Sequence, residues 1–362
     1  MSYFILINYI YFKFLSYQNK KKQNVFTLIF CSYLIFVFVS LRYQIGGDWG
    51  TYMENYENMS RYGLVDGLSI FASKFVFFIV YLFHDFKIFN ETVVLGCIFC
   101  FFYTRYLLST SNFFLSFFIT FPVFLILVGM GYVHQGVATI ICWQILINFE
   151  KKTSKEIIIY IAFASLIHLS ALIFLYIFLI KLKIKKQEDN FLFHQIIAIF
   201  ILCIIAMLIF DINVFKGIAL NLQVKFETYL FDDYYKSYGT LMRLFLFIPS
   251  IIILLIIDLK HLKNKDNLKL LKNTLYVMFA TILLTIIFRG SILFAFADRI
   301  FLGLIFFQVI ITNEYYKQYK LKKSLFIDFL VYFFPVSYLL LWLTTSKYSQ
   351  YWIPYENILF TY

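Results

Sequence analysis

The stretch Arg42-Tyr43-Gln44-Ile45-Gly46-Gly47-Asp48-Trp49-Gly50-Thr51-Tyr52 directly follows an apolar run over residues 25–41. Here the chain stops being hydrocarbon-like and offers a guanidinium, a Gly-Gly pair, a carboxylate and several aromatic rings. An ordinary membrane exit, where Arg, Trp and Tyr anchor a helix at the lipid headgroups, is one interpretation of this composition. That interpretation does not explain the Gly-Gly-Asp core, which favours a binding site.

The residue types of this stretch suit a phosphorylated sugar ligand. Gly46 and Gly47 permit positive φ and a close approach of the backbone to a ligand. Arg42 can pair with a phosphate through two parallel hydrogen bonds, which a lysine cannot do. Trp49 and Tyr52 offer flat amphipathic faces of the kind that sugars and headgroups lie against.

The composition of the whole chain is that of an integral membrane protein. Its 362 residues are 62% hydrophobic and 14% charged, with a mean hydropathy of +0.80. Soluble domains carry about 25% charged residues, and several apolar runs here approach the ~20 residues that cross a bilayer. We predict an all-α, polytopic transmembrane helical bundle of about 10–12 membrane segments, forming one membrane domain over residues 1–362.

The net charge of +12 does not indicate nucleic-acid binding, because the lysines fall in short clusters between apolar runs. Such clusters mark cytoplasmic loops by the positive-inside rule. This assignment predicts external loops at about 42–67 and 211–240 and an external tail at about 344–362. The predicted spans are 2–18, 24–41, 90–108, 113–129, 132–149, 191–210, 241–258, 273–288, 299–313 and 324–343.

Two apolar segments do not fit the charge pattern as ordinary spans: 68–83 fits it best as a re-entrant or surface helix, and 156–180 as a re-entrant pair of half-helices. Lysine clusters lie on both sides of the run 156–180, which conflicts with a single crossing. Its ~25 residues are long enough for one helix or for two half-helices that turn back near Ser165–Ser170. If both segments cross fully, the topology also closes, but Lys151, Lys152 and Lys155 then lie outside.

Ionisable residues within spans are costly in a bilayer and are therefore functional candidates. They are Arg105, His134, His168, Arg243, Arg289, Asp298 and Arg299. Most of them fall near the outer ends of their spans, on the same side as Arg42 and Asp48, whereas Arg105 fits snorkelling at an inner end. The tail aromatics, Tyr348 to Tyr355, fit an aromatic belt at the membrane interface or a platform for a sugar.

His134 and Gln135 begin a span after Gly129-Met130-Gly131, where the glycines are expected to allow a tight turn. The start of that helix would favour an anion such as phosphate; an interfacial polar pair is the alternative. His168 is either a functional residue or a packing residue at the re-entrant turn. Asp298 and Arg299 either neutralise each other or hold Arg299 rigid for a diphosphate.

These motifs together resemble the Wzy-type polysaccharide polymerases, particularly the EpsG-like branch. The resemblance rests on Arg42, Tyr43, Gly46, Asp48, Trp49 and Tyr52, then on Gln135, Gly136 and Ala138, on Ser165, His168, Ser170 and Ala171, on Arg299, and on Pro354-Tyr355. One departure is His134, which stands where the family usually has an arginine before Gln-Gly.

The resemblance implies a GT-C-like glycosyltransferase of the cytoplasmic membrane, with no cofactor and no metal. It would transfer a growing glycan from undecaprenyl diphosphate to the next lipid-linked repeat unit on the outer face, with inversion. The lipid-linked oligosaccharide and the bilayer are the expected partners, and a chain-length regulator and a flippase are further candidates. A transporter or flippase of lipid-linked sugars, a related glycan ligase and a non-catalytic assembly subunit are the alternatives.

For the base that activates the acceptor hydroxyl, Asp48 ranks first and His168 second. The leaving diphosphate needs electrostatic stabilisation, which we assign first to Arg299 and Arg42. The remaining predicted substrate-binding residues are Gly47, Trp49, Tyr52, His134, Gln135, Arg243, Arg289 and Asp298.

Overall fold

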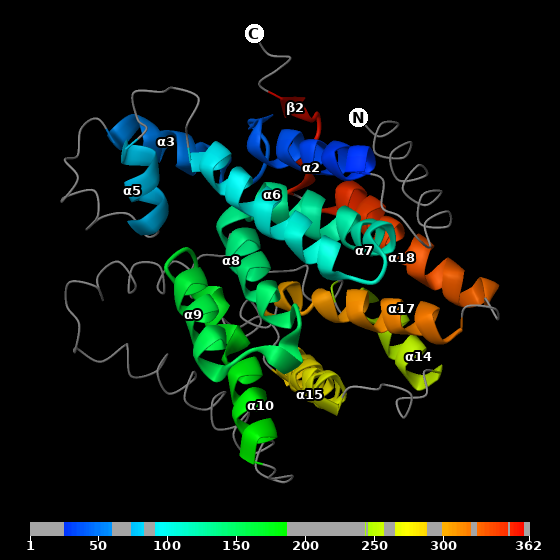
Figure 1. Ribbon diagram of the computed structural model, residues 1–362. Coiled ribbons are helices and arrows are strands. Elements are labelled where there is room, and N and C mark those ends of the chain that lie inside the picture. The colour runs from blue at the N-terminus through cyan, green and yellow to red at the C-terminus, as the bar shows by residue number, and fades with distance from the viewer. Residues whose placement is uncertain are drawn as a thin grey trace.

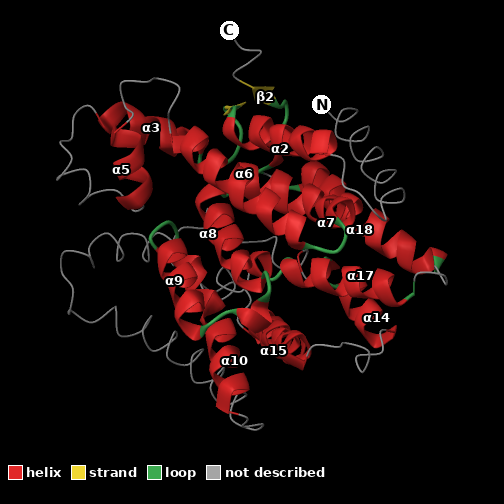
Figure 2. Ribbon diagram, viewed as in Figure 1, coloured by secondary structure: helices red, strands yellow, loops and turns green. Residues whose placement is uncertain are grey.

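Helix α6 (Glu91–Ser109) runs through the middle of the molecule, between α2 (Val25–Ser40) on one side and α8 (Val133–Trp143) on the other (Figure 1). The computed structural model describes residues 25–59, 74–82, 91–186, 243, 245–256, 265–287, 299–319, 324–346 and 348–357. The predicted spans 2–18 and 191–210, the loop 211–240, Arg289 and Asp298 lie outside these residues. The described structure is almost entirely helical, as predicted (Figure 2).

Small residues let α2 pack closely on α6. A side chain at Gly96 would come within 2.6 Å of the Ser40 Cα, so the backbones meet there without an intervening group. Further along, Ser32 Oγ lies 3.3 Å from Thr104 Oγ1. Gly96 and Thr104 are eight residues apart and share one face of α6. Close approach through small and hydroxyl residues is typical of helix pairs in membrane proteins, where lipid provides no hydrophobic drive between helices.

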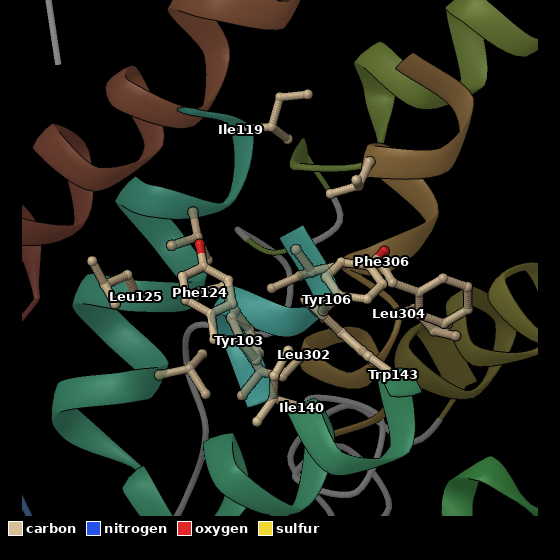
Figure 3. Close-up of a cluster of buried hydrophobic side chains, with 14 of the residues drawn as sticks. Tyr103, Tyr106, Ile119, Phe124, Leu125, Ile140, Trp143, Leu302, Leu304 and Phe306 are labelled. Carbon is tan, nitrogen blue, oxygen red and sulfur yellow. The ribbon is translucent and has the colours of Figure 1, made fainter. Parts of the chain in front are cut away.

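The core centres on Trp143 at the end of α8 (Figure 3). Its ring stacks on Phe124 of the π-helical segment η1 (Phe121–Gly129), with ring centroids 4.2 Å apart. The indole N–H donates to the carbonyl of Gly303 at 3.1 Å, so the buried polar atom of Trp143 is satisfied. This contact fixes the segment 299–305 against α8, and the start of that segment carries Arg299.

The predicted break in the apolar run 156–180 is confirmed. Helix α9 (Ser154–Ser165) begins with a capping box between Thr153 and Glu156 and ends before His168. The chain then continues as the 3₁₀ segment η4 (Leu169–Phe174) and α10 (Leu175–Lys186), which both pack against α9. The direction of these pieces relative to a bilayer stays a prediction.

The remaining described elements complete the bundle around α6 and α8 (Figure 1). One of them, α3, was not predicted, because its polar sequence lacks an apolar run. The elements are β1 (Arg42–Tyr43), α3 (Trp49–Met59), α5 (Lys74–Leu82), α7 (Phe113–Thr120), η2 (Gln144–Leu146), η3 (Phe149–Lys151), α14 (Ile248–Ile256), α15 (Lys265–Ile287), α17 (Phe306–Gln318), α18 (Leu325–Thr345), η7 (Ser349–Tyr351) and β2 (Glu356–Asn357).

Two described helices, α6 and α18, are long and apolar enough to cross a membrane, and several shorter apolar helices accompany them. Large apolar side chains project outward from α18, among them Phe326, Phe329, Phe333 and Leu340, each more than half exposed. An exposed apolar surface of this kind suits contact with lipid. The full number of 10–12 membrane segments stays a prediction.

Candidate functional site

The beginnings of three helices meet at a group of polar side chains that we call the polar cluster. Asp48 immediately precedes α3, Glu91 is the first residue of α6, and His134 lies in the first turn of α8. Helix starts carry partial positive charge, which stabilises the carboxylates placed there. The members of the polar cluster are Arg42, Asp48, Tyr52, Glu91, His134, Gln135 and Arg299.

Asp48 lies at the centre of the polar cluster. Its Oδ2 accepts a hydrogen bond of 3.2 Å from the hydroxyl of Tyr52, one turn further along α3. Burial raises the pKa of the Asp48 carboxyl. The charge of Arg299, the Tyr52 hydrogen bond and the charges of His134 and Arg42 partly offset that effect of burial.

Arg299 is held in place by two groups of the α8 start. Its Nη1 donates to Gln135 Oε1 at 2.5 Å, and its guanidinium lies over the Tyr132 ring, 4.9 Å from the ring centroid. The attraction between a guanidinium and an aromatic face restricts the orientation of the side chain. Within the described residues, Arg299 and Asp48 interact through their charges without forming a direct ion pair.

Arg42 is 1% exposed. It binds backbone groups of the fold and also contributes positive charge to the polar cluster. Its guanidinium donates to the backbone carbonyl of Val39, at the end of α2, and to that of Ile45 at 3.2 Å. Burial lowers the pKa of Arg42 to about 10, so it stays protonated at neutral pH. Arg42 therefore shapes the loop that presents Asp48 and adds positive charge behind it.

Glu91 was not among the residues predicted from the sequence. Its Oε1 lies 2.7 Å from His134 Nε2, which ties the start of α6 to the start of α8. The His134 ring in turn packs on the Tyr52 ring, with centroids 5.2 Å apart. A lone carboxylate at the beginning of an apolar span is a signal that would have found Glu91, because such a residue is costly in a membrane segment.

The tail packs against the bend ahead of α8, and Trp352 is buried there, so the interpretation of Trp352 as part of an aromatic belt is wrong. Trp352 is 1% exposed, and its indole N–H donates to the carbonyl of Ile126 at 3.1 Å. A side chain at Gly131 would lie 2.0 Å from the Trp352 ring, so Gly131 is needed to admit this ring. Gly131 was expected to allow a tight turn; the chain does bend at Tyr132, but Gly131 makes room for the tail.

The tail also holds the loop that carries Asp48. Gly46 N–H donates to the carbonyl of Tyr351 at 2.9 Å, and β2 pairs with β1 so that Asn357 lies opposite Arg42. Gly46 has a φ of +96°, as its sequence suggested. Its close approach, however, is to the backbone of Met130 rather than to a ligand, because a Cβ there would lie 2.3 Å from the Met130 carbonyl oxygen.

The other predicted site residues lie as follows. Gly47 is exposed, with open space where a side chain would be. The Trp49 ring packs edge-on against Tyr43, with centroids 5.3 Å apart. His168 caps η4, where its Nδ1 accepts from the Ser170 backbone N–H at 3.2 Å. Arg243 is buried ahead of α14.

A small hollow lies elsewhere, between α7, α14, α17 and α18. No charged side chain lines it, so it offers no group for the stabilisation of a diphosphate. Its lining residues are Ile119, Pro249, Ser250, Gln308, Thr312, Leu330, Val331 and Pro335.

Together, the fold and the polar cluster define a helical protein with apolar outer faces and an arginine–carboxylate site at the starts of its helices. The chain belongs to the EpsG family, whose family model matches residues 25–357. This family is associated with exopolysaccharide biosynthesis. No curated protein and no solved structure matches the chain.

Proposed function

We propose that this protein is a polysaccharide polymerase. It transfers a growing glycan from undecaprenyl diphosphate to a hydroxyl of the next lipid-linked repeat unit. The reaction takes place at the outer face of the cytoplasmic membrane. A single observation carries the proposal. The Asp48 carboxylate lies close enough to Arg42, six residues before it, and to Arg299, far along the chain, for both positive charges to act on it.

The chemistry of the transfer needs two kinds of group. A base accepts the proton of the acceptor hydroxyl while the hydroxyl oxygen bonds to the anomeric carbon of the donor glycan. The bond between that carbon and the diphosphate oxygen breaks, and undecaprenyl diphosphate leaves with the electron pair. Attack from the side opposite the leaving group inverts the anomeric configuration.

Asp48 is the base in this proposal, and Arg299 is the group that binds the leaving diphosphate. A half-buried carboxyl with a raised pKa binds a proton more firmly than an ordinary aspartate, which suits a general base. Arg299, fixed by Gln135 and Tyr132, stabilises the charge that develops on the diphosphate. Arg42 adds positive charge from behind, while His168 is kept as the second candidate for the base.

The aromatic and glycine residues beside Asp48 form the sugar-binding part of the proposal. Gly47 and Trp49 are open enough to meet a glycan, and the edge-on contact with Tyr43 fixes the Trp49 ring. Arg243, Arg289 and Asp298 are further candidates for contact with the donor lipid. We propose no cofactor or metal, and we propose that a flippase and a chain-length regulator act beside this protein.

The test replaces Arg299 by Ala in a strain deleted for the gene and follows both polymer length and lipid-linked intermediates. We expect normal amounts of the variant in the membrane, loss of polymer, and single repeat units on the lipid carrier. Arg105→Ala is the matched control, because Arg105 is an exposed arginine of α6. Long chains in the Arg299→Ala strain would contradict the assignment.

The same strains separate the competing functions. A polymerase defect leaves the single repeat units accessible to a sugar-modifying reagent from outside the cell, whereas a flippase defect leaves them protected. A ligase defect leaves chains of normal length that are not attached to their final acceptor. Protected repeat units or normal unattached chains would therefore replace the polymerase proposal with one of these alternatives.

A further inference from the structure

Glu91 carries an unusual feature for a buried acid: only one of its oxygens has a partner. The residue is 7% exposed, and Oε1 is occupied by the hydrogen bond to His134 Nε2 at 2.7 Å. Oε2 is buried and has no hydrogen-bond partner in the described structure. Leaving a buried carboxylate oxygen unpaired is unfavourable, and nearly all such atoms in folded proteins have a partner.

Other buried oxygens without a partner in the described residues, such as those of Tyr106, Gln144 and Ser250, belong to neutral groups. The desolvation of a neutral oxygen costs less than that of a carboxylate. A purely structural tie between α6 and α8 would use Oε1 alone. An amide at position 91 would make that tie without burying a charge.

The position of Glu91 points to the substrate as the missing partner. Its His134 partner packs against Tyr52, and the hydroxyl of Tyr52 binds Asp48, so Glu91 and Asp48 flank the same aromatic pair. The charge of Glu91 also reaches the Tyr52 hydroxyl. A carboxylate oxygen accepts hydrogen bonds only, so its complement is a donor group such as a sugar hydroxyl.

We propose that Glu91 is a specificity-determining residue whose Oε2 accepts a hydrogen bond from a hydroxyl of the acceptor sugar. His134 is a positioning residue that holds Oε1 and thereby aims Oε2. This inference rests on the proposed transferase function, in which Asp48 takes the proton from the attacking hydroxyl. Glu91 binds a different hydroxyl and so selects an acceptor with the correct hydroxyl pattern.

The test uses lipid-linked repeat units isolated from cells that lack this protein, added to membranes that contain each variant. Glu91→Gln keeps the shape of the side chain and can still accept from His134, but it places an NH₂ group at Oε2. We expect the half-saturating concentration of repeat units to rise ~10- to 100-fold, the range typical of a lost hydrogen bond to a charged group. We expect a smaller change in the maximal rate.

Glu54→Gln is the matched control, since Glu54 is an exposed carboxylate of α3. His134→Gln should raise the half-saturating concentration through the same group. The double variant with Glu91→Gln should therefore show less than the product of the two single effects, because interacting residues are not additive.

An unchanged half-saturating concentration in Glu91→Gln, with only a lower melting temperature, would overturn the inference and make Glu91 a structural residue. If that variant fails to accumulate, Glu91→Asp takes its place, because it keeps the charge but withdraws the oxygens by one methylene. An unchanged half-saturating concentration of repeat units in Glu91→Asp would also contradict the proposal. Failure of the unmodified protein to extend the repeat units would refute the transferase function itself, and with it this inference.

Discussion

Gln135 and Arg299 hold each other through both side chain and backbone. The guanidinium of Arg299 donates to Gln135 Oε1 at 2.5 Å, and the side-chain amide of Gln135 reaches back to the carbonyl of Arg299 at 3.5 Å. The two residues are 164 positions apart in the chain. The contact therefore joins the start of α8 to the segment ahead of α17. It also orients Arg299, whereas the guanidinium of Arg42, the other arginine of the polar cluster, donates to backbone carbonyls.

Replacement of Gln135 by Leu should separate the placement of Arg299 from its presence. The guanidinium keeps its charge but loses its fixed partner, so we expect the rate of polymer formation to fall ~10- to 100-fold, as for a hydrogen bond to a charged group. The rate is measured in membranes with matched amounts of protein. A rate equal to that of the unmodified protein would show that Tyr132 alone orients Arg299.

Replacement of Asp48 by Asn should remove activity while leaving stability at neutral pH the same or higher. Burial raises the pKa of Asp48 above its ordinary value of 3.8, so the folded state binds this proton more firmly than the unfolded state. The resulting stabilisation is complete below the unfolded pKa and is lost as pH rises through the folded pKa. At neutral pH the ionised Asp48 therefore lowers the free energy of unfolding. Melting temperatures in detergent at pH 5 and pH 7.5 test this, and a large loss of stability at pH 7.5 would contradict it.

The pH dependence of the rate should report the same carboxylate. A base must be ionised, so we expect the rate to fall on the acid side at a pH above the 3.8 of an ordinary aspartate. The Tyr52 hydrogen bond favours the ionised form of Asp48, and Tyr52→Phe should therefore move this acid limb to higher pH. A limb that stays at the same pH in Tyr52→Phe would assign the titration to another group, with His168 next.

The stability cost of a larger side chain at position 131 should depend on the size of the side chain at position 352. Gly131→Ala places a methyl group against the Trp352 ring, and overpacking of this kind costs about 1–3 kcal/mol. Trp352→Phe removes the part of the ring that the methyl group meets, so the double variant should melt at a higher temperature than Gly131→Ala alone. Independent, additive losses in the two variants would argue against the direct contact.

Labelling of single cysteines should establish on which side of the membrane the polar cluster lies. Thr51, exposed on α3, and Lys151, exposed on η3, fall on opposite sides in the predicted topology. In a background without the native cysteines, we expect an impermeant thiol reagent to label Thr51→Cys in intact cells and Lys151→Cys only after lysis. The reverse pattern would place the polar cluster at the cytoplasmic face. It would then contradict the proposed reaction with a lipid-linked glycan donor at the outer face.

The sequence predicted the long apolar helices closely. The spans 90–108 and 324–343 correspond to α6 and α18, and the span 113–129 to α7 followed by η1. A run of apolar residues bounded by polar ones has few alternatives to a helix in a chain of this composition. Helix α15 begins eight residues before its predicted span at 273, because lysines and leucines extend a helix beyond the apolar run.

The polar cluster was predicted only in part. Six of its seven members were predicted, and the structure brings them together. Ionisable and aromatic residues at the ends of spans are costly or conspicuous, which selected Arg42, Asp48, Tyr52, His134 and Arg299. Gln135 was selected because it begins a span. Which partner each one takes depends on how distant helices pack, and periodicity carries no information about that. The burial of Trp352 was missed for the same reason, since an exposed aromatic belt and a buried aromatic segment have the same composition.

The strap formed by Tyr351 to Asn357 has a consequence for biosynthesis. These residues leave the ribosome after every member of the polar cluster, yet they pin both the Gly46 loop and the bend at Gly131. A nascent chain that has already threaded most of its helices into the bilayer would therefore still lack a formed site.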